Sequence, residues 1–356
     1  IKNGNNNNLT DFYAYSNPSL YCIQVDNPAF MNTNLGGLSN KDGQSTYSSN
    51  CGCTVNIPDV NFKNALLAIA SLNTNSNGQI ECYEAASYTG GIDVNTLGIS
   101  NLTGIEAFTA ITSLNCSENN LTSLNVSFNT ALQYLNCVVN SINTFSFTPN
   151  GNLQTLYIGN NQISGSLDLS GYTNLIDLNC ANNQLTNLTL PVTNTLTTIQ
   201  CQGNAITSLN TSGNTGLVSL YCSGNQIDQL DLSTNTALVN IACNSNLLTS
   251  LNIQNGNNSN LSSFNATSNP ALTCIQVSNV SYMNTNFSAG KDAGATYSTV
   301  CPLVCVVNIP DANFKNALLA NAAINTNSDL EIQCSEAAAF TGTINVANLS
   351  ISDLTG

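Results

Sequence analysis

The chain has 356 residues, of which 42% are hydrophobic and only 7% are charged, and its net charge is −14 with five Lys and Arg residues in total. This acidity argues against binding nucleic acid through phosphates or docking on an anionic membrane. The 14 Cys residues come without any His, which removes most zinc sites, Ser-His-Asp triads and Cys-His pairs, and no apolar stretch reaches the length of a transmembrane helix.

Residues 1–52 are predicted to be the last coil and C-terminal cap of a repeating unit, because they recur later in the chain. Residues 1–4 match residues 253–256, and residues 17–25 match residues 269–277, at an offset of 252 residues. The chain is therefore expected to open inside one unit, contain one complete unit and end inside a third, as a window on a longer tandem array.

Residues 53–104 are predicted to form a helical N-terminal cap. A Pro-Asp start signal ends at Asp59. Phe62, Leu66 and Ile69 then fall on one face of the helix that follows. The same text returns 252 residues later, so residues 305–356 are predicted to be the N-terminal cap of the next unit.

A calcium-binding motif follows the predicted helix. The twelve residues from Asn73 to Glu84 fit the EF-hand loop, with oxygen donors at positions 1, 3 and 5, Gly at 6 and Glu at 12. The candidate Ca²⁺ ligands in this loop and its copy are Asn73, Asn75, Asn77, Gln79, Glu81 and Glu84, and Asn325, Asn327, Asp329, Glu331 and Glu336. Asn replaces Asp at most positions, which predicts weak binding; the alternative is a loop that keeps only its turn.

Residues 105–270 carry the pattern L-x-C-x-x-N-x-L eight times over, at steps of 21 to 23 residues. The Cys position is filled by Cys116, Cys137, Ile158, Cys180, Cys201, Cys222, Cys243 and Ala266. Each turn is expected to offer a short strand whose Leu and Cys point inward, and stacked turns bury a continuous core. The Asn three residues after each Cys position is expected to bond the backbone at the bend, including that of the next turn.

This pattern resembles leucine-rich repeats, L-x-x-L-x-L-x-x-N/C-x-L, at the short end of their length range. A second, similar pattern lies about half a repeat further along the chain, at Leu124, Leu209 and Leu230. Such nested repeats are similar to the short bacterial subclass called IRREKO and to secreted surface proteins of Bacteroidota. The resemblance implies a repeat solenoid with a parallel β-ladder, mostly β and coil, with small helical EF-hand-like caps. It also implies an extracellular, secreted or surface-attached protein.

The cysteines divide into two sets. Those in the caps recur at similar spacings, which predicts the disulfides Cys22–Cys51, Cys53–Cys82, Cys274–Cys301 and Cys305–Cys334. The ladder cysteines share their position with Ile158 and Ala266, which predicts small, buried, reduced side chains. Residues 271–304 are predicted to be the C-terminal cap of the complete unit. Only one residue separates Cys51 from Cys53 at the junction of two units, so neighbouring units are expected to form a stiff rod.

The outward strand positions form the face on which such solenoids usually bind ligands. Its candidate binding residues are Tyr134, Tyr157, Asp177 and Tyr221, set among amides. The face has no Trp and little charge, so a bland solvated face is the alternative. The chain has no nucleophile with its base, and therefore an enzyme is not expected.

Two functions remain open from the sequence. The first is a structural fibre or stalk, in which neighbouring copies of the repeat unit assemble head to tail as a filament. The second is an adhesin or binding module that uses the strand face to hold glycans or surface proteins.

Overall fold

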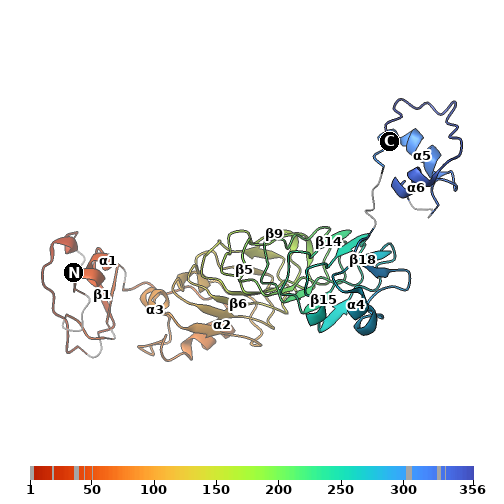
Figure 1. Ribbon diagram of the computed structural model, residues 1–356. Coiled ribbons are helices and arrows are strands. Elements are labelled where there is room, and N and C mark those ends of the chain that lie inside the picture. The colour runs from red at the N-terminus through yellow and green to blue at the C-terminus, as the bar shows by residue number, and fades with distance from the viewer. Residues whose placement is uncertain are drawn as a thin grey trace.

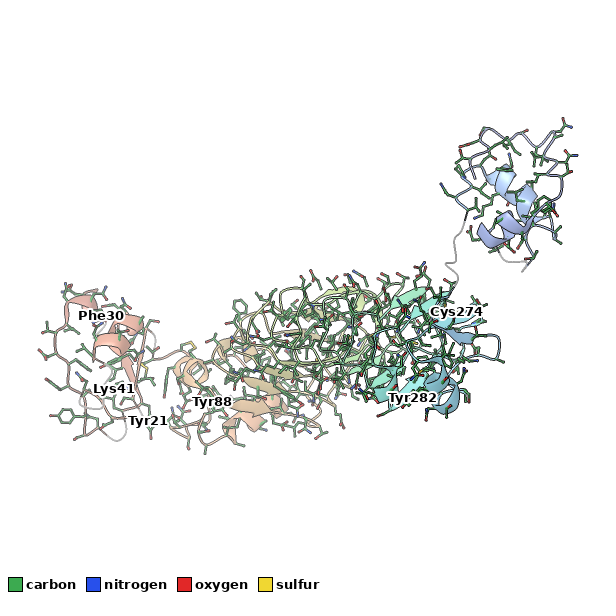
Figure 2. The ribbon with its side chains drawn as sticks, viewed as in Figure 1. Tyr21, Phe30, Lys41, Tyr88, Cys274 and Tyr282 are labelled. Atoms are coloured by element: carbon green, nitrogen blue, oxygen red, sulfur yellow. A yellow bond between two sulfur atoms is a disulfide. The ribbon has the colours of Figure 1, made fainter. Side chains whose placement is uncertain are left out.

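The computed structural model describes residues 4–17, 20–35, 40–43, 45–49, 51–301, 307–326, 330–332 and 334–356. Its centre is a leucine-rich-repeat solenoid of stacked coils, mostly strand and coil, that runs from α2 (Val60–Leu67) to α4 (Val280–Asn286) (Figure 1). Figure 2 places Tyr88 towards one end of this solenoid and Tyr282 towards the other. No helix among the described residues is long and apolar enough to cross a membrane.

One face of the solenoid is a nine-stranded parallel sheet. Its strands, in spatial order, are β3 (Gly91–Asp93), β4 (Ser113–Asn115), β6 (Tyr134–Asn136), β8 (Thr155–Tyr157), β10 (Asp177–Asn179), β12 (Thr198–Gln200), β13 (Ser219–Tyr221), β15 (Asn240–Ala242) and β17 (Ser263–Asn265). The central residue of each strand is buried and its two neighbours are at least partly exposed, as the period of two in a strand requires. Eight strands are those of the predicted repeats, and β3 from the N-terminal cap adds a ninth.

The second pattern within each repeat forms another row of parallel strands, and this row is interrupted. The row consists of the pair β5 (Ser123–Asn125) and β7 (Thr144–Ser146), the pair β9 (Ser164–Asp168) and β11 (Gln184–Thr189), and the group β14 (Gln229–Asp231), β16 (Ser250–Asn252), β18 (Cys274–Gln276) and β19 (Thr296–Ser298). Residues 205–211 form no strand, which leaves a break in the row between β11 and β14.

The side chains of the predicted Leu and Cys ladders are buried, and those of the Asn ladder are buried or half-buried. A single hydrophobic core continues from Ile57 in the N-terminal cap to Tyr297 in the C-terminal cap. In a typical coil, the Asn161 Nδ2 donates to the carbonyl oxygens of Cys137 at 3.0 Å and Ile158 at 3.1 Å, while its Oδ1 accepts from the Ile142 amide at 2.9 Å. The partners from another coil therefore belong to the preceding turn, not to the next one as expected.

Two short helices and a loop close the N-terminal end of the solenoid. Asp59 caps α2, because its Oδ1 accepts from the amides of Asn61 and Phe62. Its Oδ2 accepts from the amides of Ser100 at 2.9 Å and Asn101 at 3.2 Å, which ties the helix to the first turn of the solenoid. The second helix, α3 (Cys82–Ser87), begins after a capping box of Glu81 and Glu84, and the 3₁₀ turn η2 (Ile105–Ala107) leads into the coils.

The flanking segments repeat the same local structures. Towards the N-terminus these are η1 (Asn6–Asn8), β1 (Cys22–Gln24), α1 (Pro28–Leu35) and β2 (Thr46–Ser48), which correspond to η3 (Asn258–Asn260), β18, α4 and β19. Towards the C-terminus, α5 (Ala312–Leu319) and α6 (Cys334–Ala339) correspond to α2 and α3. Asp311 caps α5 and accepts from the amides of Ser352 and Asp353, just as Asp59 does one unit earlier.

Candidate binding face and cap site

The outward residues of the nine-stranded sheet are called the strand face below. They are the first and third residues of each strand, and they include the four candidate binding residues Tyr134, Tyr157, Asp177 and Tyr221. All four side chains are half-buried. Strands β6, β8 and β10 are direct neighbours, so the sheet brings the first three of these residues together although they are far apart in sequence.

Tyr134, Tyr157 and Asp177 form a contacting cluster. The rings of Tyr134 and Tyr157 lie with centroids 6.0 Å apart and planes at 75°, an edge-to-face pair. The Tyr157 hydroxyl donates to the Asp177 Oδ2 at 2.6 Å. Burial, and then this hydrogen bond, raises the pKa of Tyr157 to about 12, so the hydroxyl stays a donor at physiological pH. The Asp177 Oδ1 is screened from solvent and has no hydrogen-bond partner among the described residues.

Tyr221 stands apart from this cluster. It lies on β13 in line with Gln200 of β12 and Asn179 of β10, three strands from Tyr157. The Asn residues that end the strands use their amide oxygens within their own turns; for example, the Asn136 Oδ1 accepts from the Val138 amide. Each of these side chains keeps an NH₂ group as a donor for water or a ligand. The strand face therefore offers hydrogen-bond donors along its length, and at one place it combines the Asp177 carboxylate with the rings of Tyr134 and Tyr157.

The predicted cation loop lies between α2 and α3. The carboxylate of Glu84 accepts from the Thr74 amide at 2.9 Å and, through its other oxygen, from the Glu81 amide at 3.1 Å. Glu81 accepts from the side-chain amides of Asn75 at 3.1 Å and Asn77 at 2.6 Å. Burial raises the pKa of Glu84. Burial also acts to raise the pKa of Glu81, but the hydrogen bonds at its carboxylate outweigh burial and leave this pKa below its ordinary value.

One buried oxygen in this loop has no partner. The Asn73 side chain is 9% exposed, its Nδ2 donates to the Leu67 carbonyl at 3.1 Å, and its Oδ1 accepts no hydrogen bond from the described residues. Gln79, the remaining candidate, accepts from the Lys63 ammonium at 3.3 Å on the surface. Among the described residues, no group of three or more His, Cys, Asp or Glu side chains is arranged to hold a metal ion, so any cation here relies on amide and backbone oxygens as well.

The copy of the loop repeats the contacts that can be compared. Glu336 accepts from the Thr326 amide at 2.7 Å and hydroxyl at 2.9 Å, and Asn325 donates to the Leu319 carbonyl. Glu331 forms an ion pair with Lys315 at 2.6 Å. Asn327 and Asp329 lie outside the described residues. The Thr that holds the last Glu was missed in the sequence, although Thr74 and Thr326 occupy equivalent positions in the two copies.

Three of the four predicted disulfides are present: Cys22–Cys51, Cys53–Cys82 and Cys274–Cys301. The fourth involves Cys305, which lies outside the described residues. The six ladder cysteines are free and fully buried, and burial raises the pKa of each thiol, for example to about 12 for Cys116. Such thiols pack as small apolar groups and are poor nucleophiles.

The stacked coils and their ladders define a leucine-rich-repeat fold, and one comparison with a known protein family agrees with it. Residues 151–192 match the family described as Leucine Rich repeats (2 copies). No curated protein sequence matches the chain.

Several solved structures are similar to this chain. A functional domain of InlJ from Listeria monocytogenes, which includes a cysteine ladder, is 30% identical with a TM-score of 0.48; the match covers 64% of this chain and 58% of that one. An internalin (inlF) from the same species is 17% identical with a TM-score of 0.29, covering 70% of this chain and 98% of that one. YopM from Yersinia enterocolitica is 18% identical with a TM-score of 0.37, covering 53% and 52%.

Proposed function

We propose that this protein is an extracellular, non-enzymatic binding module that holds its ligand on the strand face. The observation that carries the proposal is the cluster of Tyr134, Tyr157 and Asp177, which a regular parallel sheet holds together on three adjacent strands. Aromatic side chains with a polar tip are efficient anchors for sugars and proteins. The three disulfides support an oxidising, extracellular setting.

The test is adhesion of protein-coated beads to surfaces coated with polysaccharide or with protein. Replacing Tyr134, Tyr157 and Tyr221 together by Ser should abolish bead retention while leaving the circular dichroism spectrum unchanged. The matched control replaces three exposed apolar residues outside the nine-stranded sheet by Ser, namely Phe128, Val192 and Leu247. Equal retention of both variants would refute binding through the strand face.

A second candidate function, a head-to-tail fibre or stalk, is favoured by the repeated local structure. The contacts of Asp59 in one cap recur at Asp311 in the next, and Asp42 holds the amides of Ser16 and Asn17 as Asp292 holds those of Ser268 and Asn269. Repeated units that share one geometry propagate as an open rod. Electron microscopy of the native material should show long fibres with a regular axial repeat, and isolated single units would refute this candidate.

We further propose that Ca²⁺ binds the loop from Asn73 to Glu84 and stabilises the N-terminal cap. The buried, unpartnered Oδ1 of Asn73 supports this, because position 1 of an EF-hand loop supplies a ligand oxygen and a buried acceptor without a donor is costly. The Glu84 carboxylate, at position 12, would supply the ligand that such loops use in bidentate form. Thr74 holds that carboxylate in place.

Calorimetric titration with CaCl₂ tests the site. Asn73→Asp adds a negative charge at position 1 and should tighten Ca²⁺ binding by about tenfold or more, since ligand charge sets the affinity of such loops. Asn95→Asp makes the same change at an exposed position outside the loop and should leave the affinity as it is. If neither the natural chain nor Asn73→Asp takes up Ca²⁺, the loop serves only as a turn.

A further inference from the structure

We infer that the cluster of Tyr134, Tyr157 and Asp177 receives a positively charged group, an ammonium or guanidinium on a basic peptide segment of the partner. The inference rests on the proposed function, because it names the ligand chemistry of the strand face.

The charge distribution of the solenoid is the first argument. No Lys or Arg occurs between residues 64 and 290, whereas nine Asp and Glu residues occur in this stretch. The only ion pair among the described residues, Lys315 with Glu331, lies outside the solenoid. Asp177 therefore has no counter-ion on its own face, and a cationic partner complements both this carboxylate and the acidity of the whole solenoid.

The bonding of Asp177 is the second argument. Its Oδ2 is held by the Tyr157 hydroxyl at 2.6 Å, which fixes the carboxylate on the face. Its Oδ1 is shielded and accepts nothing from the described residues. A half-satisfied, shielded carboxylate gains most from a charged donor.

The ring geometry is the third argument, and it favours a cation over a sugar. Tyr134 and Tyr157 meet edge to face at 75°, so they present no flat platform on which a pyranose could span both rings. They form a corner in which a compact cation lies within about 6 Å of a ring centroid, the range of a cation–π contact. The Asp177 carboxylate closes this corner at the Tyr157 hydroxyl.

The experiment measures calorimetric binding of an acetylated lysine pentapeptide to the full chain, with a glutamine pentapeptide as the neutral probe. Asp177→Asn keeps the shape and should weaken lysine-peptide binding by about tenfold, the scale for loss of a desolvated charge contact. Tyr157→Phe keeps the ring and should weaken it by about threefold. The matched control is Asp228→Asn, which removes the same charge from an exposed residue off the nine-stranded sheet and should leave affinity within about twofold.

The outcomes separate the inference from the proposed function. Equal weakening by Asp177→Asn and Asp228→Asn would show attraction to general acidity and overturn the inference. Unchanged affinity in Asp177→Asn together with lost bead adhesion in the triple Tyr→Ser variant would also overturn the inference but leave the binding face intact. If Asp177→Asn does not change bead retention on polysaccharide, the ligand of the strand face is a neutral sugar and the inference is overturned. Unfolding curves that match that of the natural chain show that all three single variants are folded.

Discussion

Val139 has a φ of 56°, a left-handed backbone conformation that a β-branched residue adopts only under strain. It is one of a series, because the residue before each ladder Asn has positive φ, and Gly203 and Gly224 fill the same position without strain. Val139→Gly should therefore raise the free energy of unfolding by about 0.5–1 kcal/mol. Val138→Gly, at a neighbouring residue without positive φ, should lower it. Urea unfolding curves check both predictions. A loss of stability in Val139→Gly would show that the greater entropy of the unfolded chain outweighs the relief of backbone strain.

The ladder Asn residues hold neighbouring coils together through several bonds each. The Asn225 Nδ2 donates to the carbonyl oxygens of Cys201 and Cys222, each at 3.0 Å, and its Oδ1 accepts from the Ile206 amide at 3.0 Å. Asn225→Ala leaves these buried groups unpaired and should cost about 2–4 kcal/mol in the free energy of unfolding. Asn225→Asp should cost at least as much, because a carboxylate cannot donate to the two carbonyl groups. Asn210→Ala, at an exposed turn, should cost under about 1 kcal/mol.

At the scale of one element, the cysteine ladder makes stability depend on pH. Burial raises the pKa of Cys116, Cys201 and Cys243 to about 12 and raises the pKa of the other three ladder thiols well above the ordinary value. In the unfolded chain these thiols ionise near about 8.5, so the unfolded state loses protons that the folded state keeps. The contribution of these thiols to the free energy of unfolding is therefore fully present below about pH 8.5. Above that pH the free energy of unfolding falls by up to about 1.4 kcal/mol for each thiol and each pH unit.

Urea unfolding at about pH 7.5, 8.5 and 9.5 measures this dependence. Cys201→Ala should reduce the slope of the free energy of unfolding against pH by about one thiol's share. The substitution suits the site because Ala266 fills the equivalent position in another coil. An unchanged slope would show that the ladder thiols titrate alike in both states.

Eight of the nine strands in the large sheet could be predicted from the sequence, because each depends on a local signal, an apolar residue on either side of one exposed residue; β3, in the cap, was not predicted. The second row was harder, since its strands vary in length and Leu209 repeats the pattern without forming a strand. The proximity of Tyr134, Tyr157 and Asp177 follows from strand register, so those residues could be proposed together. The hydrogen bond from Tyr157 to Asp177 and the bare oxygen of Asn73 could not, because both depend on side-chain rotamers.

At the scale of the whole molecule, the cap and the coils share one core. That core continues from Ile57 to Tyr297, whereas the buried apolar side chains of the two flanking segments, such as Ile23 and Tyr47 or Ile309 and Ile332, form two separate clusters. Stability in a stack of repeats is a sum of local terms and contacts between neighbours, and an uncovered end exposes the core of its last coil. The unit from residue 53 to residue 301 should therefore be independently stable, while the same unit without its N-terminal cap should not.

Two fragments test this prediction. The fragment 53–301 should melt at the same temperature as that region of the full chain. The fragment 105–301 lacks α2, α3 and β3, which uncovers apolar side chains of the first coil such as Ile111, Leu114 and Leu121. Each newly exposed side chain costs about 1.5–3 kcal/mol, so the melting temperature should fall by about 10 °C or more. Hydrogen exchange should show the loss of protection starting at β4 and decreasing towards β17. Equal melting of both fragments would mean that the coils need no cap and that the helices serve another purpose.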